Sequence, residues 1–578
     1  MYNPMKSRGP GLACSVASLY GVLALPSTAQ SPCEVWFAEG TDAGGQLGSS
    51  VAVSTSPGTG TVLFAGAPGA SAHPILSPPD QGRIRRFDHE LQWLVPNSQG
   101  YWDWSEGPSV SGAGQGAGQK LGGALDLEGK WLAYGADGSG SPAGVGFAQV
   151  LLNTSAGWQL EQHFPEPTGT PGTWFGRDVA VAETVHPWGT LAIGAPFAGT
   201  DGAVYLYRYI FDFVDWVWIP KATLSPLLPD GNTQFGIAVD LASDLLAVGA
   251  PLQDQLFGGS DVCGVYVYWA DPVNWQFAQL LTAGDPAKGD RFGDAVAVTD
   301  STLVVGAPLK WQDSTDLVGA VYVYERDSSA PPSFTEVAKL ASPTSDYATF
   351  FGQAVAIDGD RIVVGAPGAV VNGERLGRAY VYERSGGVWP TTPSRVLDGD
   401  GQHFADFGTS VDLDGELVAV GAAKYGEGVP VKDGAVFVYD LASSFCAQPQ
   451  SVSISSGGSQ AFELEAGAAH AGLPYLVLGT TAGSHPGQLV DGVPLPLNWD
   501  GPGGYYGFTL TQASSATLPG TFGVLDAGGA ASASVVLPPG LSPTLAGLYL
   551  HHAFLVLDPA QQGVAVFGSN ADELVLVP

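Results

Sequence analysis

The stretch Phe292-Gly-Asp-Ala-Val-Ala-Val298, followed by Val304-Val-Gly-Ala-Pro308 and Gly319-Ala-Val-Tyr-Val-Tyr324, decides the fold. Its first two apolar runs are short and typical of buried strands. The proline after Gly-Ala cannot donate to a β-ladder, so we expect it to end the second strand. The Val-Tyr-Val-Tyr run alternates as a third strand would. The stretch therefore predicts three consecutive strands joined by tight turns.

These three phrases recur along the chain. From the second copy to the last, the period lies between 54 and 60 residues, and in four copies 14 residues separate the Phe from the Gly of Gly-Ala-Pro. A looser fourth strand follows, as in Trp275–Leu281 and Phe334–Leu340. The seven copies begin at Leu47-Gly48, Leu121-Gly122, Phe175-Gly176, Phe235-Gly236, Phe292-Gly293, Phe351-Gly352 and Phe407-Gly408.

Four antiparallel strands per copy describe one blade of a β-propeller. Two copies join their first two strands through Asp358-Gly359 and Asp414-Gly415, the usual chemistry of a two-residue hairpin. Closing the repeats into a ring removes the exposed sheet edges that an open array would present. We therefore predict an all-β chain with a seven-bladed β-propeller followed by a small C-terminal β-sandwich.

The ring needs a seam, because the last copy stops after its third strand. Glu34-Val-Trp-Phe-Ala38, ahead of the first copy, resembles a fourth strand and is expected to complete the seventh blade. Cys33 begins that segment and Cys446 lies seven residues after Tyr439, so a Cys33–Cys446 disulfide is predicted, with two independent thiols as the alternative. A loop this long gives an ideal stabilisation of about 4 kcal/mol. Cys263 is expected to be a small buried residue.

Composition divides the chain into three parts. Residues 1–29, with a basic start and an apolar stretch, read as a secretory signal peptide, which leaves a propeller at 30–446 and a Gly-rich accessory domain at 447–578. No Lys or Arg follows Lys432. Surface attachment is one role for the last domain and a plain accessory role is the other. Its predicted strands include Phe462–Glu465, Tyr475–Leu478, Tyr506–Leu510 and Ala553–Leu557.

Charge limits the partners. The chain has 55 carboxylates against 22 basic side chains and a formal net charge of -33, so nucleic acid and anionic membrane surfaces are poor partners, because each requires a basic face. After the signal segment no run approaches the roughly 18 apolar residues of a membrane span. We expect a monomer that is secreted or held at the cell surface.

The run from Trp275 to Pro308, with its acidic connector Gly284–Asp290, resembles the FG-GAP repeat family, whose best-known relatives form the integrin alpha-subunit propeller. The resemblance covers roughly residues 34 to 440 and implies an extracellular, glycosylated, disulfide-bonded adhesion protein. Calcium loops of that family have a longer acidic pattern. The nearest matches, Asp412–Glu416 and Asp398–Gly401, lack the full ligand set, so no cofactor is expected, and calcium is the alternative that the sequence leaves open.

No catalytic signature accompanies the repeats, because the chain has no Gly-x-Ser-x-Gly, no phosphate loop and no metal-binding spacing of histidines. We predict a non-catalytic scaffold that binds an extracellular protein or glycan. The alternatives are a polysaccharide-active propeller enzyme, which would show converging Asp, His or Arg in a deep axial pocket, and a purely structural surface protein. The predicted contact face comprises aromatic and acidic loop residues: Asp254, Phe257, Asp261, Trp311, Asp313 and Asp316.

Overall fold

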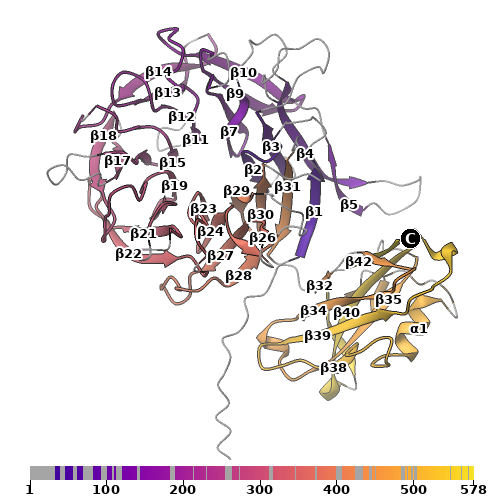
Figure 1. Cartoon of the computed structure of the whole chain (residues 1–578). Coiled ribbons are helices and arrows are strands. Elements are labelled where there is room, and N and C mark those ends of the chain that lie inside the picture. Colours follow the sequence, from indigo (N-terminus) through magenta and orange to yellow (C-terminus); the bar gives the residue numbers. More distant parts are fainter. Residues whose placement is uncertain are drawn as a thin grey trace, which may run out of the picture.

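A computed structural model describes most of the chain after residue 32. It covers residues 33–39, 46–55, 61–68, 83–92, 101–106, 110–111, 120–139, 144–182, 189–253, 263–311, 317–398, 406–423, 434–441, 445–448 and 451–577, with short interruptions inside several of these ranges. Seven sheets stand around a central axis, and a separate pair of sheets follows (Figure 1). The chain is therefore all-β, with a seven-bladed propeller and a C-terminal pair of sheets, as the repeats predict.

Each blade is an antiparallel sheet, and in blades 1 to 6 the strands lie in chain order from the axis outward. Blade 1 contains β2 (Val51–Ser54), β3 (Thr61–Ala67), β4 (Arg83–Gln92) and β5 (Tyr101–Glu106), with β6 (Val110–Ser111) beside β4. Blade 2 contains β7 (Leu121–Glu128), β8 (Trp131–Ala136), β9 (Phe147–Thr154) and β10 (Gly157–Pro165). Blade 3 contains β11 (Val179–Ala182), β12 (Thr190–Ala195), β13 (Ala203–Phe211) and β14 (Trp216–Leu224).

Blades 4 to 6 repeat this order, and blade 6 inserts a two-stranded hairpin between its second and third strands. Blade 4 contains β15 (Val239–Ala242), β16 (Leu245–Ala250), β17 (Gly264–Ala270) and β18 (Trp275–Leu281). Blade 5 contains β19 (Ala295–Val298), β20 (Thr302–Ala307), β21 (Ala320–Arg326) and β22 (Phe334–Ala341). Blade 6 contains β23 (Ala354–Asp358), β24 (Arg361–Ala366), β27 (Arg378–Glu383) and β28 (Arg395–Leu397), and its inserted hairpin is β25 (Val370–Val371) with β26 (Glu374–Arg375).

Blade 7 joins the two ends of the propeller. Its inner strands are β29 (Phe407–Asp414), β30 (Leu417–Ala422) and β31 (Ala435–Asp440), and its outer strand is β1 (Cys33–Glu39). β1 pairs antiparallel with β31 from Cys33 opposite Asp440 to Glu39 opposite Ala435. The predicted closure by the N-terminal segment is thus confirmed.

Contacts between glycines set the spacing of the blades. A Cβ added to Gly306, in the Gly-Ala-Pro phrase of blade 5, would lie 2.0 Å from the carbonyl oxygen of Gly352, in the Phe-Gly phrase of blade 6. The same contact, at 2.0 to 2.1 Å, recurs between every blade and the next, including Gly421 of blade 7 against Gly48 of blade 1. Both glycines of the repeat are therefore required by close backbone approach.

The outer strands carry regular bulges. In blades 2 to 5 the pairing between third and fourth strands skips one residue of the fourth strand, and β1 skips Val35 in the same way. A bulge twists a strand and disrupts its hydrogen-bonding edge, which protects exposed edges from pairing with other chains. The skipped residues are Glu161, Lys221, Ala278 and Val337.

The second domain packs two sheets over one core. One sheet has β32 (Phe445–Gln448), β34 (Gly458–Glu465) and β39 (Ala530–Leu537), and a hairpin joins β36 (Gln488–Val490) to β37 (Val493–Leu495). Phe462, Leu464 and Val535 of the first sheet share a core with Val477 and Phe554 of the second. The second sheet contains β33 (Ser451–Ser453), β42 (Asp572–Val577), β40 (Tyr549–Asp558), β35 (Pro474–Thr480), β38 (Phe522–Val524) and β41 (Val564–Gly568).

One predicted strand of this domain is wrong. Tyr506–Leu510 belongs to the helix α1 (Tyr505–Thr511). A five-residue apolar run fits an alternating strand and a helix equally well. The buried residues Tyr506 and Thr509 are three apart, which places them on one helix face. The Thr509 hydroxyl accepts a hydrogen bond from the Gly479 amide at 2.9 Å, and this tertiary contact holds the helix against β35.

The two cysteines of the predicted disulfide lie in strands whose side chains fall outside the described part of the structure. Cys33 begins β1, and Cys446 lies in β32, which pairs with β34 of the second domain. Cα atoms of β1 and β32 come within 8 Å of each other. The Cys33–Cys446 bond stays a prediction. Cys263, immediately before β17, is buried as expected.

The glycine contacts make a sharp stability prediction. Gly306→Ala places a methyl group against a backbone carbonyl that cannot move without shifting a neighbouring blade, so we expect the free energy of unfolding to fall by more than about 4 kcal/mol. Gly123→Ala is the matched control, because its added Cβ would meet only the Lys120 carbonyl at 3.4 Å. Denaturant unfolding measures both. A Gly306→Ala protein as stable as the control would contradict the proposed role of the contact.

Candidate functional site

The innermost strands of all seven blades line a channel of about 1430 Å³ along the axis. Figure 1 shows these strands, including β7, β11, β15, β19, β23 and β29, around the axis. The loop face is the face that carries the Phe-Gly and Gly-Ala-Pro turns, and its end of the channel includes Lys120, Arg177 and Arg291. The hairpin face carries the turns between first and second strands, and its end includes Asp300, Asp358 and other acids.

A ring of strained residues surrounds the channel on the loop face. Each Phe-Gly or Leu-Gly pair forms the centre of a four-residue turn, with its glycine at φ between 81° and 94° as a type II turn requires. The residue before each pair also has a positive φ, between 48° and 57°, although it is never glycine and such a conformation costs about 1 to 2 kcal/mol. These seven half-buried residues are Gln46, Lys120, Trp174, Gln234, Arg291, Phe350 and Asp406.

This ring holds side chains of every chemical kind in equivalent positions. Arg177 lies over the Trp174 ring at 5.7 Å, and Arg291 is held by Asp294 through hydrogen bonds of 2.7 and 2.5 Å. Trp174 also meets Phe197 edge to face with 4.6 Å between ring centres. The backbone of the ring is fixed by the repeat, while its side chains vary, which suits recognition more than chemistry.

Carboxylates inside the channel connect neighbouring blades at four of the seven junctions. The Val181, Val239, Val298 and Val53 amides donate to Asp126, Asp178, Asp240 and Asp412 of the preceding blade at 2.5, 2.8, 2.6 and 2.7 Å. Positions can be counted from the glycine of the Phe-Gly or Leu-Gly pair. On this count, each accepting aspartate lies one residue earlier in its blade than the donating valine lies in the next blade. Adjacent inner strands share no β-ladder, so these carboxylates supply the acceptors that the inner-strand amides need.

Burial in the channel makes these carboxyls weak acids. It raises the pKa of Asp178 to about 6, of Asp240 to about 7 and of Asp412 to about 6, and that of Asp126 well above its ordinary value. For Asp240 the negative charges of Asp178 and Asp412 add to the effect, while its backbone hydrogen bonds oppose it. Mutual repulsion across the channel therefore couples the blades electrostatically.

The raised pKa values predict a pH dependence of stability. A folded-state pKa near 7, against 3.8 for the unfolded chain, means that the folded state holds a proton that the unfolded state releases, so this contribution weakens as pH rises from about 4 through 7. Asp240→Asn keeps an oxygen for the Val298 amide but cannot titrate. We expect the unfolding free energy of wild type, relative to Asp240→Asn, to fall between pH 5 and pH 7.5.

Burial lowers the pKa of His552 to about 3, so this histidine makes the unfolding free energy rise with pH. Both proteins contain the same histidines, so the difference between their unfolding free energies does not include this effect. Asp212→Asn is the control, because Asp212 is exposed and backbone hydrogen bonds lower its pKa, so its charge does not change above pH 5. Urea unfolding at both pH values decides the matter. An Asp240→Asn curve parallel to that of wild type would show that Asp240 does not titrate in this window.

The described side chains include no group of three or more His, Cys, Asp or Glu arranged to hold a metal ion. The predicted two-residue hairpins are present but start one residue later than expected: Asp358 and Asp414 end their strands, paired with Arg361 and Leu417, and the turns begin at Gly359 (φ 54°) and Gly415 (φ 61°). Asp414 accepts from the Thr55 amide and Asp358 from the Gly415 amide, at 2.5 and 2.9 Å. These two carboxylates therefore form hydrogen bonds between neighbouring blades of the propeller.

Of the predicted contact face, the described residues include Trp311 alone. Asp254, Phe257, Asp261, Asp313 and Asp316 lie outside them. Trp311 is 43% exposed and its ring centre lies 6.5 Å from that of Tyr347, which is 55% exposed. The exposed Arg375, on β26, donates to the Tyr347 and Ala348 carbonyls at 2.6 and 2.9 Å. Sequence reasoning missed both: Tyr347 lies in the connector between blades 5 and 6, and Arg375 comes from the next repeat.

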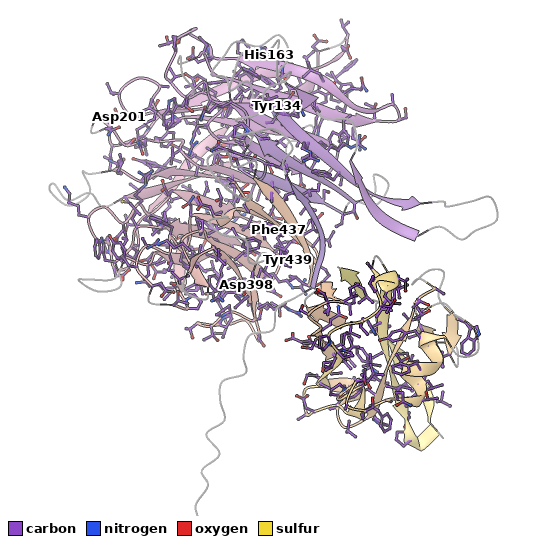
Figure 2. The ribbon with its side chains drawn as sticks, turned by 45° about the vertical axis from the view of Figure 1, so that its right-hand side comes forward. Tyr134, His163, Asp201, Asp398, Phe437 and Tyr439 are labelled. Atoms are coloured by element: carbon purple, nitrogen blue, oxygen red, sulfur yellow. The ribbon has the colours of Figure 1, made fainter. Side chains whose placement is uncertain are left out.

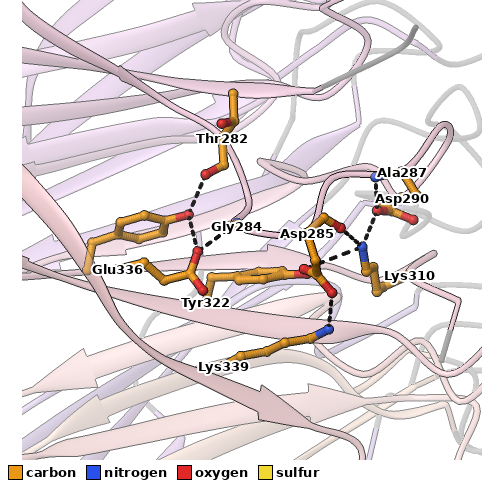
Figure 3. A network of polar contacts seen from close by, with 10 residues as sticks. Thr282, Gly284, Asp285, Ala287, Asp290, Lys310, Tyr322, Glu336 and Lys339 are labelled. Atoms are coloured by element: carbon orange, nitrogen blue, oxygen red, sulfur yellow. Dashed lines mark hydrogen bonds and ion pairs between the residues drawn. The ribbon is translucent and has the colours of Figure 1, made fainter.

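A buried ion pair fixes the loop beneath Trp311 (Figure 3). The Lys310 ammonium lies 2.7 Å from the Asp290 carboxylate and 3.5 Å from Asp285, and both Lys310 and Asp290 are buried. Burial alone would raise the pKa of Asp285, but hydrogen bonds from Lys339 and Tyr322 and the charge of Lys310 hold it below its ordinary value. The pair thereby ties the connector between blades 4 and 5 to the loop that presents Trp311.

Similar polar contacts occur where blade 6 meets blade 7. The Tyr439 hydroxyl donates to the Asp398 carbonyl at 2.7 Å, and the Asp398 carboxylate accepts from Arg378 at 2.7 Å. Figure 2 shows Tyr439 and Asp398 close together on neighbouring blades. The loop face is thus held from below by polar contacts at more than one blade.

Removing the buried cation should be costly. Lys310→Met leaves the Asp290 carboxylate buried without its counter-charge, so we expect a loss of about 3 to 5 kcal/mol in unfolding free energy. Lys339→Met is the control: it removes a lysine that also contacts Asp285, but both partners are partly exposed, so the loss should stay below about 1 kcal/mol. Chemical denaturation of both variants measures the difference, and equal losses would contradict the role given to Lys310.

Comparisons with known proteins agree with this architecture. Residues 275–324 and 334–382 match the FG-GAP repeat family. Integrin alpha-7 of Rattus norvegicus is 33% identical over 205 residues, which are 32% of this chain and 17% of the integrin. Integrin alpha-3 of Mus musculus is 25% identical over 244 residues, 39% of this chain and 22% of the integrin. The chain thus carries FG-GAP repeats and is distantly similar to the N-terminal region of integrin alpha subunits.

The matched regions span about a fifth of those integrins' own length. Among solved structures, Sqt1 of Chaetomium thermophilum aligns with 71% of this chain and 98% of its own, at 13% identity and a TM-score of 0.38. Among the described residues, no helix is long and apolar enough to cross a membrane.

Proposed function

We propose that this chain, an FG-GAP repeat protein whose propeller is distantly similar to that of integrin alpha subunits, is a non-catalytic binding protein of the cell exterior that recognises an extracellular protein or glycan on its loop face. The observation that carries the proposal is the exposed pair Trp311 and Tyr347 beside Arg375. Trp, Tyr and Arg are the residue types that dominate binding energy at interfaces.

The polar contacts that hold the backbone next to Trp311 and Tyr347 favour a binding role. Arg375 donates one hydrogen bond to the Tyr347 carbonyl and one to the Ala348 carbonyl, and Lys310, next to Trp311, forms an ion pair with Asp290. Side chains on a fixed backbone lose little freedom when a ligand binds, so less of the interaction energy is spent on ordering. The two aromatic rings stand at 62° to each other and present both a face and an edge.

An enzyme that acts on polysaccharides is the second candidate, because the axial channel gathers carboxyls with raised pKa values, as active sites often do. Binding has the stronger support. Asp126, Asp178, Asp240 and Asp412 each already accept a hydrogen bond from the neighbouring blade, and the same arrangement recurs at four blade junctions. A catalytic acid and base would occupy distinct environments, whereas these carboxyls repeat one structural role.

A direct test replaces the exposed tryptophan. Binding of the mature chain to a glycan array and to a library of extracellular proteins identifies ligands, and Trp311→Ala should then weaken the affinity for the ligand by about tenfold or more, since removing an aromatic anchor costs roughly 1.4 kcal/mol or more. Tyr347→Ala should act in the same direction. Surface plasmon resonance measures the dissociation constants.

Phe211→Ala provides the control, because Phe211 is an aromatic residue 51% exposed at the end of β13 on blade 3, away from this cluster. It should leave the affinity unchanged. Equal binding by wild type and Trp311→Ala would rule out this part of the loop face as the contact surface, and release of sugars from a polysaccharide by the wild type would favour the enzyme instead.

A further inference from the structure

The seam between blades 7 and 1 is closed by two independent sets of contacts. The outer set is the backbone ladder of β1 on β31. The inner set comes from β29: the Ser410 hydroxyl donates to the Gly48 carbonyl at 2.9 Å, and Asp412 and Asp414 accept from the Val53 and Thr55 amides at 2.7 and 2.5 Å.

Apolar packing adds to the inner set. Ala419, Val436 and Val438 of blade 7 share one buried cluster with residues of blade 1 that include Val51 and Leu63. Leu47 forms a β-bridge with Gly434, as Phe235 does with Gly202 and Phe351 with Gly319 at junctions that have no chain end. The glycine contact of Gly421 with Gly48 is also present. Apart from β1, the seam is therefore built like an ordinary junction between blades.

The consequence is that β1 can leave without opening the ring. Its departure would expose the outer edge of β31, where those backbone N–H and C=O groups between Ala435 and Asp440 that face β1 would lack partners, while β30 keeps pairing with the other edge. Such an edge is a template for any strand of matching register. The sequence shown to match it is residues 33–39, so the partner that fits is a second copy of this chain.

We propose that the outer position of blade 7 is an exchangeable strand site, at which β1 of one copy replaces β1 of another, so that reciprocal exchange links two closed propellers into a dimer. The inner contacts keep both rings intact during the exchange. Each copy recovers the same ladder that it gives up, and exchange of identical elements is a low-cost route to dimers. The formal charge of -33 per chain opposes the encounter, and this repulsion is screened by salt.

The test uses the full mature chain in two forms, one with an affinity tag and one with a fluorophore, each purified as a monomer. The two are mixed at high concentration under reducing conditions, which open any bond between Cys33 and Cys446, warmed below the unfolding temperature, cooled, and separated by size exclusion with light scattering. We expect a species of twice the monomer mass that carries both labels, and more of it at high ionic strength.

Two controls make the result specific. Phe37 and Phe437 are directly paired between β1 and β31, so the double variant Phe37→Cys, Phe437→Cys can fix β1 to its own chain. The oxidised variant should give no mixed dimer and the reduced one should. An excess of synthetic peptide spanning residues 31–40 should abolish the mixed dimer, whereas the same peptide with Phe37→Pro should not, because proline cannot complete the ladder.

Absence of a mixed dimer at every temperature below unfolding would overturn the proposal. So would a mixed dimer that persists in the oxidised double variant, since the copies would then associate through another surface. Equal inhibition by unrelated extended peptides would show a general edge site and remove the second copy as its specific partner.

Discussion

The propeller depends on one close approach, the contact of a Gly-Ala-Pro glycine in each blade with the carbonyl of the Phe-Gly glycine in the next. No side chain fits there, because even a methyl carbon would lie about 2 Å from that oxygen. The contact fixes how near two inner strands can lie, and its repetition around the ring determines the channel that they enclose. The same Phe-Gly turn forces the preceding residue into a left-handed conformation at the channel mouth. One backbone contact therefore governs the ring, the channel and the loop face together.

Much of this architecture could be predicted from the sequence, because glycine, proline and alternating apolar residues report on the backbone. The Gly-Ala-Pro phrases marked the ends of second strands, and Glu34–Ala38 could be assigned to the seam because blade 7 lacked a strand. The helix at Tyr505–Thr511 could not be predicted, since its conformation depends on the contact of Thr509 with Gly479, far away in sequence. Strand patterns that depend on tertiary partners are the ones that fail.

The candidate site was less accessible to sequence reasoning. Trp311 could be chosen as an exposed aromatic in a loop, but Tyr347 lies in the connector between blades 5 and 6 and Arg375 comes from the following repeat. Asp126, Asp178, Asp240 and Asp412 are ordinary acids in an acidic chain, and only the closed ring places each one beside an amide of the next blade. Roles that depend on neighbouring blades appear only once the ring is assembled.

Two sets of residues have different roles in the propeller: one set fixes the backbone, and the other varies on the loop face. Repeated glycines, channel carboxylates and the buried Lys310–Asp290 pair hold the backbone, and side chains on the loop face vary from blade to blade. A rigid frame with variable side chains suits recognition. The seam adds a second feature, because blade 7 contacts blade 1 through its inner strand in addition to the ladder of β1 on β31.

An experimental structure of the chain at high resolution tests the central claim most directly. We predict seven sheets around the axis, with the Phe-Gly carbonyl of each blade in contact with the Gly-Ala-Pro glycine of the preceding one, and residues 33–39 as the outer strand of the last sheet. A different number of blades, or glycine pairs far enough apart to admit a side chain, would contradict the account.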